Sequence, residues 1–111
     1  MGRISTHVLD IARVAPAAGI AVELRAAGEL LHACRTNSDG RTDAPMLIAE
    51  RIPAGPDELV FHVEDYLRAE RPGQRPFYDR ITIRFVVSEE TGHYHVPLLL
   101  AAHGYSTYRG S

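Results

Sequence analysis

Polar and apolar side chains alternate over most of this 111-residue chain, a period of two that is typical of β-strands with one buried face. The clearest case is 79–87, where the apolar residues Ile81, Ile83, Phe85 and Val87 alternate with the polar residues Arg80, Thr82 and Arg84. In the first such segment, Ser5, His7 and Leu9 share one face. Strands are predicted at 4–10, 20–26, 30–36, 42–48, 58–63, 79–87 and 93–101, with a last one beginning near 105.

One segment lacks this alternation. Residues 64–70 contain good helix formers and no β-branched side chain, which predicts a two-turn helix. Gly and Pro mark the turns, and Asp39-Gly40 supplies the positive φ that a tight turn needs. About eight short strands at regular spacing with one helix indicate an all-β protein, an antiparallel β-sandwich. We expect one domain over 1–111, since a chain of this length buries roughly 65% of its unfolded surface.

Composition narrows the function classes. The chain is 45% apolar and 23% charged, as in ordinary globular proteins, and its net charge of −2 argues against nucleic acid as a main partner. No apolar run approaches the roughly 20 residues of a membrane span, and the N-terminus lacks the apolar core of an export signal. We therefore expect a cytoplasmic protein, or a periplasmic one if a signal was removed. The single Cys34 excludes an internal disulfide and a multi-cysteine metal site.

Histidine and arginine are the candidate chemical groups. His93 and His95 are two residues apart on one strand and therefore project from the same face. They could transfer protons near neutral pH, or bind zinc with His7 as a third ligand. Arg41, next to Gly40 in the predicted turn, offers a planar, permanently charged fork for a carbonyl, urea or carboxylate.

The C-terminal residues 103–111 form a strand-like run that ends in Tyr108-Arg109-Gly110-Ser111. Gly110 has no side chain, so the backbone there can approach a neighbouring group closely. One interpretation is that the chain ends in this way to present aromatic, cationic, hydroxyl and carboxylate groups together. The alternative is an ordinary edge strand with an irregular end.

These segments together resemble the transthyretin-related family, and within it the hydroxyisourate hydrolases. Four motifs carry the resemblance, in the family's order and over nearly the whole chain. They are Ser-Thr-His-Val-Leu-Asp at 5–10, Asn-Ser-Asp-Gly-Arg at 37–41, His-Tyr-His-Val-Pro-Leu-Leu at 93–99 and Tyr-Ser-Thr-Tyr-Arg-Gly-Ser at 105–111. The terminal Tyr-Arg-Gly-Ser separates the hydrolases from the hormone carriers of the same fold.

The resemblance implies a sandwich of two four-stranded sheets with one short helix, assembled as a homotetramer with active sites between dimers. It implies hydrolysis of 5-hydroxyisourate to 2-oxo-4-hydroxy-4-carboxy-5-ureidoimidazoline in urate degradation, with no cofactor and no metal. The site residues it implies are His7, Arg41 and His95 as catalytic groups, and His7, Arg41, Tyr108 and Ser111 as substrate-binding groups. A non-catalytic carrier of small molecules on the same fold is the alternative.

Overall fold

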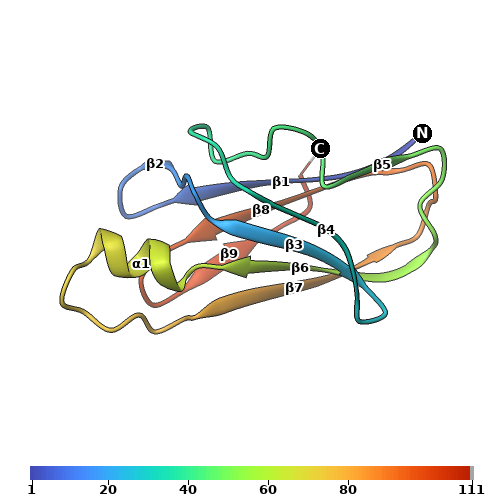
Figure 1. Ribbon diagram of the computed structural model, residues 1–111. Helices are drawn as coiled ribbons and strands as arrows, with labels where there is room; N and C mark the ends of the chain where they lie inside the picture. Colours follow the sequence, from blue (N-terminus) through green and yellow to red (C-terminus); the bar gives the residue numbers. More distant parts are fainter. Residues whose placement is uncertain (111) are drawn as a thin grey trace.

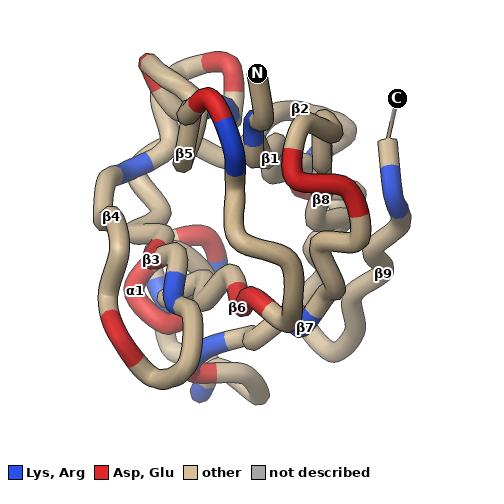
Figure 2. Tube along the Cα trace, turned by 90° about the vertical axis from the view of Figure 1, so that its right-hand side faces the viewer, with Lys and Arg blue, Asp and Glu red and all other residues tan. Residues whose placement is uncertain are grey.

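The computed structural model describes residues 1–110, which fold into two β-sheets packed face to face (Figure 1). One sheet has the strand order β2-β1-β8-β9 with β5 paired to β1, and the other has the order β4-β3-β6-β7. The end-on view in Figure 2 separates the two layers, with β1, β8 and β9 in one and β3, β6 and β7 in the other. The all-β sandwich predicted from the alternation is confirmed.

The described residues form nine strands and one helix. Their bounds are β1 Gly2–Asp10, β2 Ala15–Pro16, β3 Ala21–Ala26, β4 Glu29–Arg35, β5 Leu47–Ala49, β6 Gly55–His62, α1 Glu64–Glu70, β7 Arg80–Val87, β8 His93–Leu100 and β9 Tyr105–Thr107. The helix has the predicted bounds, and most strands agree within one or two residues.

Three details differ from the expectation. The short β2 pairs with the end of β1 inside a segment without strand periodicity, so one sheet has five strands instead of four. The strand expected at 42–48 is confined to Leu47–Ala49, since Pro45 cannot donate a ladder hydrogen bond. β6 begins at Gly55, earlier than the predicted 58, because Gly55 and Pro56 already pair with the end of β7.

The central pair of the first sheet, β1 and β8, is parallel, whereas the alternation had indicated an antiparallel sandwich. These strands come from opposite ends of the chain, so no hairpin fixes their relative direction. Their register sets Arg3 opposite His93 and Ser5 opposite His95. This pairing brings the first motif of the sequence beside the third.

The core lies between the sheets and takes the apolar side of each alternating strand. Its largest fully buried side chains are Phe61, Ile4, Ile20, Leu24, Met46, Ile52, Leu59, Ile81, Leu98 and Leu100. Because these residues occupy the inner faces, the motif residues at alternate positions, Ser5 and His7 on β1 and His93 and His95 on β8, lie on the outer face of their sheet. The described part of the chain contains no helix long and apolar enough to cross a membrane.

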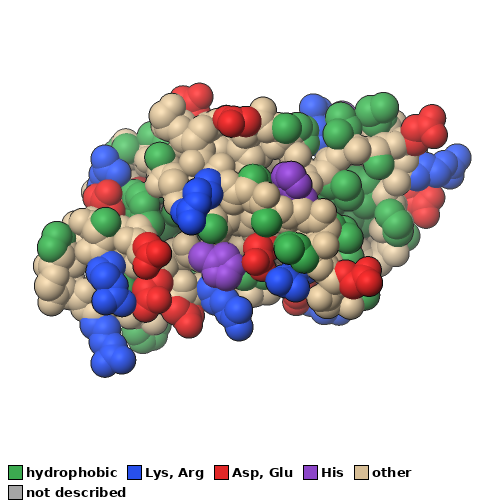
Figure 3. Space-filling model, viewed as in Figure 1, with side chains coloured by type: hydrophobic (Ala, Val, Ile, Leu, Met, Phe, Trp, Pro, Cys, Tyr) green, Lys and Arg blue, Asp and Glu red, His purple; other side chains and the backbone are tan. Residues whose placement is uncertain are grey.

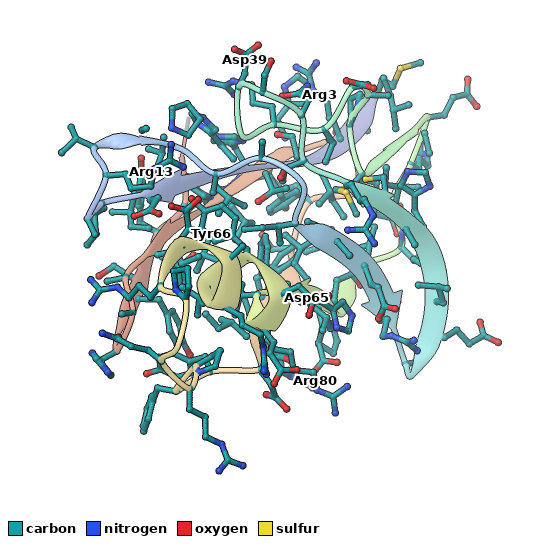
Figure 4. All side chains as sticks on the ribbon, turned by 60° about the vertical axis from the view of Figure 1, so that its left-hand side comes forward. Arg3, Arg13, Asp39, Asp65, Tyr66 and Arg80 are labelled. Atoms are coloured by element: carbon teal, nitrogen blue, oxygen red, sulfur yellow. The ribbon has the colours of Figure 1, made fainter. Side chains whose placement is uncertain are left out.

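The helix is anchored to the end of β1 by a polar network. The Tyr66 hydroxyl donates to Asp10 Oδ2 at 2.7 Å and accepts from Arg13 Nη1 at 3.2 Å. Figure 4 shows Tyr66 on the side of α1 toward the segment that carries Arg13. Burial, followed by the hydrogen bond to Asp10, raises the pKa of Tyr66 to about 12, so this phenol stays a neutral donor.

Charged side chains of both signs are interspersed on the face turned to the viewer in Figure 3. Ion pairs within one element include Arg68 with Glu64 at 3.1 Å and Arg25 with Glu23 at 2.9 Å. No large area of this face carries a single sign of charge.

Candidate active site

The turn at 37–41 positions Arg41. The side chain of Asn37 organises it, because Asn37 Oδ1 accepts from the backbone N–H of Asp39 at 2.9 Å and of Arg41 at 3.2 Å. Gly40 has the predicted positive φ, 74°. Its carbonyl accepts from Val8 N–H at 2.7 Å, which ties the turn to β1. These hydrogen bonds therefore hold the backbone of Arg41 in place beside β1.

His7 lies on the outer face of β1, next to this turn. It forms an isolated antiparallel bridge with Arg41, and its Nε2 lies 2.9 Å from the carbonyl oxygen of Asp39. A carbonyl oxygen can only accept, so Nε2 carries the hydrogen and Nδ1 of the neutral ring keeps its lone pair. The turn thus fixes both the orientation and the tautomer of His7.

His95 lies on the neighbouring strand β8 and is held on two sides. Its Nδ1 is 2.9 Å from Ser5 Oγ. Gly110 pairs with it through the backbone, with Gly110 N–H donating to the His95 carbonyl at 2.7 Å. A Cβ at Gly110 would lie only 2.5 Å from His95 Cδ2. The predicted close approach of the backbone at Gly110 is confirmed, and the group it approaches is this imidazole.

Arg41 and His95 share a cleft of about 420 Å³ on the outer face of the first sheet. The cleft is open to solvent and follows β1 and β8, with the segment after the Arg41 turn as its other wall. Two arginines and two histidines face a single aspartate in it, so it favours an electron-rich ligand. Its lining residues are Arg3, Ser5, Thr6, Arg41, Thr42, Asp43, Ala44, Pro45, His93 and His95.

The surroundings of His95 favour its neutral form. Burial is the largest cause that lowers its pKa from the ordinary 6.5, followed by the positive charge of Arg41 and then by His7. The lowered pKa favours the neutral imidazole of His95, which has a ring nitrogen able to accept a proton. Of the three predicted catalytic residues, Arg41 and His95 line the cleft, whereas His7 is joined to Arg41 by the backbone bridge and is not among the lining residues.

Tyr108 lies elsewhere in the same chain. It lines a second, mostly apolar cleft of about 210 Å³ between the sheets at the β7 edge, together with Tyr94 and Phe85. This cleft shares no lining residue with the cleft of Arg41 and His95. Within one chain, Tyr108 and His95 thus line different clefts, and Ser111 lies outside the described residues.

The zinc alternative required His7, His93 and His95 to meet. Among residues 1–110, no three His, Cys, Asp or Glu side chains are grouped closely enough to hold a metal ion. His93 instead has its Nδ1 3.3 Å from Arg3 Nη2, while Nε2 of His7 and Nδ1 of His95 have the partners given above. The three imidazoles are therefore oriented by other contacts.

Sequence reasoning missed two supporting residues. Ser5 contacts His95 and lines the cleft, and Asn37 shapes the turn that carries Arg41. Position 5 shares a strand face with His7, which was a weak signal, but the partner of Ser5 depends on the parallel register of β1 and β8. Asn37 was identified only as part of the turn motif.

Comparison with known proteins identifies the family. The sequence model of the HIUase/Transthyretin family matches residues 4–110. The chain belongs to this family. Among its relatives, the 5-hydroxyisourate hydrolase of Deinococcus radiodurans is 48% identical over 97% of this chain and 95% of the relative.

Solved structures of the family have the same fold. The 5-hydroxyisourate hydrolase of Klebsiella pneumoniae superposes with a TM-score of 0.85 at 40% identity, covering 100% of both chains. The transthyretin of Sparus aurata superposes with a TM-score of 0.83 at 24% identity, covering 97% of this chain and 96% of its own. The second similarity shows the fold alone, since the HIUase/Transthyretin family spans both kinds of protein.

Proposed function

We propose that this protein hydrolyses 5-hydroxyisourate to 2-oxo-4-hydroxy-4-carboxy-5-ureidoimidazoline in urate degradation. The relatives that match over nearly the full chain are named for this substrate. The observation that carries the proposal is the pairing of a half-buried, neutral imidazole, His95, with the guanidinium of Arg41 in one cleft. A carrier has no need of a proton acceptor whose pKa is lowered in this way.

Opening a cyclic amide with water requires a base, a stabilised oxyanion and a protonated leaving nitrogen. His95 takes a proton from water, and the resulting hydroxide attacks the ring carbonyl. The charge of Arg41 faces the oxygen that becomes negative. The proton then passes from the imidazolium to the leaving nitrogen, so the step is balanced without any cofactor.

His7 shares this proton transfer. Its Nε2–H is held by the carbonyl of Asp39, which leaves Nδ1 to accept a proton or a hydrogen bond from the substrate. His7 is bridged to Arg41 and contributes to the lowered pKa of His95, so either imidazole can take the proton from water or return it to the leaving nitrogen.

Tyr108 and Ser111 complete the proposal as substrate-binding residues in a homotetramer whose sites take residues from more than one subunit. One side of the sandwich supports this assembly, because β7 and β9 are each an edge strand of their sheet and Tyr108 lines the apolar cleft beside them. Val86 on β7 is 64% exposed. Free edges and apolar side chains of this kind are suited to pairing with a second copy. We also propose a cytoplasmic location.

The decisive experiment is the decay of freshly made 5-hydroxyisourate, followed by ultraviolet absorbance with and without protein. The proposal expects acceleration by the wild type. Arg41→Ala, His7→Ala and His95→Ala should each lower kcat by at least about 10²-fold, the size of one oxyanion donor or one general base. A wild-type protein that binds the compound without accelerating its decay would favour the carrier alternative instead.

A further inference from the structure

We propose that Ser5 is a positioning residue for this reaction: its hydroxyl oxygen accepts a hydrogen bond from His95 Nδ1–H and so leaves Nε2 as the proton-accepting atom. The inference rests on the proposed function, in which His95 acts as the base. It adds Ser5 to the residues of the proposed site and assigns the hydrogen of the neutral His95 ring to Nδ1.

The geometry holds the ring at two places. Ser5 Oγ lies 2.9 Å from Nδ1, and the parallel register sets the two residues directly opposite each other. Gly110 lies against Cδ2 on the other side of the ring, where a Cβ would be 2.5 Å away. Among residues 1–110, Nε2 of His95 has no hydrogen-bond partner, so it is the nitrogen left for water or substrate.

The direction of the hydrogen bond follows from the proton transfer. If Ser5 donated to Nδ1, the neutral ring would carry its hydrogen on Nε2 and could not accept a proton there. If Nδ1–H donates to Ser5 Oγ, Nε2 has the lone pair, and the same hydrogen bond persists when Nε2 gains its proton. Only the second arrangement serves both protonation states without rotation of the hydroxyl.

No contact with the core explains why the residue at position 5 is a serine. It lies on the outer face of β1, away from the core, and lines the cleft with His95. Within the described residues its hydroxyl has no other hydrogen-bond partner. Removing that hydroxyl should therefore leave folding intact and release the imidazole.

The test compares wild type, Ser5→Ala and Ser5→Thr, the last of which keeps a hydroxyl on the same carbon. Thr82→Ala, which removes an exposed hydroxyl from β7 in the other sheet, is the matched control. Two readouts are taken on each protein: steady-state kinetics with 5-hydroxyisourate, and the ¹⁵N chemical shifts of the histidine ring nitrogens, which distinguish the Nδ1–H from the Nε2–H tautomer.

We expect the Nδ1–H tautomer for His95 in the wild type and a mixture in Ser5→Ala. The kcat of Ser5→Ala should fall by about 10- to 100-fold with KM nearly unchanged, since the ring is misdirected but the cleft is intact. Ser5→Thr should restore much of kcat, and Thr82→Ala should behave as wild type.

An Nε2–H tautomer in the wild type, or a Ser5→Ala protein with wild-type kcat, overturns the inference while the proposed function stands. A wild-type protein without turnover removes the proposed function itself, so the two failures are distinguishable.

Discussion

Replacing Gly110 by alanine tests whether the end of the chain controls the position of the His95 imidazole. A methyl group at this position would lie 2.5 Å from His95 Cδ2. Carbon atoms in ordinary contact are about 3.5–4.0 Å apart, so the ring and the backbone must separate by roughly 1 Å or more. The substitution therefore shifts the position of the His95 ring while the imidazole itself is kept.

The size of the effect differs between stability and activity. Gly110 lies near the end of the chain and can move outward by breaking its 2.7 Å hydrogen bond to the His95 carbonyl. That loss costs about 1 kcal/mol of unfolding free energy and lowers Tm by about 4 °C. A misplacement of about 1 Å in a reacting group can cost about 10²-fold in rate. We therefore expect a folded protein with a kcat lowered by about 10- to 100-fold.

The measurement combines kcat with thermal unfolding, and Gly104→Ala is its matched control. Gly104 lies in the connection between β8 and β9, has no left-handed φ, and would place its Cβ in open space. It should keep wild-type activity and Tm. A Gly110→Ala protein within twofold of wild-type kcat, or an equal loss in Gly104→Ala, would refute the reasoning.

Three further outcomes follow from the structure. Because the pKa of His95 is lowered from 6.5, the acid limb of the kcat/KM profile should lie below pH 6.5. The unfolding free energy should also fall as the pH drops below 6.5, since the unfolded chain binds that proton more readily, and His95→Gln should weaken the pH dependence of both kcat/KM and stability. Gly40→Ala should lower the free energy of unfolding, measured with urea, by more than about 2 kcal/mol, because φ is 74° and a Cβ would overlap the carbonyl oxygen of Val8. Gly73→Ala, where φ is 83° but the Cβ would lie in open space, should lower it by only about 1–2 kcal/mol. Tyr66→Phe should cost about 1–3 kcal/mol, since it leaves the buried Asp10 carboxylate without one donor, and a loss below 0.5 kcal/mol in the same assay would contradict the anchoring of α1.

The sequence by itself determined most of the strands, the helix and, for strands such as β1 and β7, which side is buried. Alternation is a local property, so the inward residues of 79–87 and the outward face of Ser5 and His7 could be read without knowing their neighbours. Turn chemistry is also local, and the positive φ at Gly40 followed from the residue types of the turn. The four motifs were sufficient to indicate the family.

Only the tertiary structure decided which of these elements meet. The parallel pairing of β1 with β8 joins segments about 90 residues apart, as in the contact of Ser5 with His95, and nothing in either strand specifies its partner's direction or register. The same holds for the approach of Gly110 to His95, where the sequence indicated a close contact but not the group contacted. The lowered pKa of His95 depends on burial and on charges from other segments, so it too arises from the assembled fold.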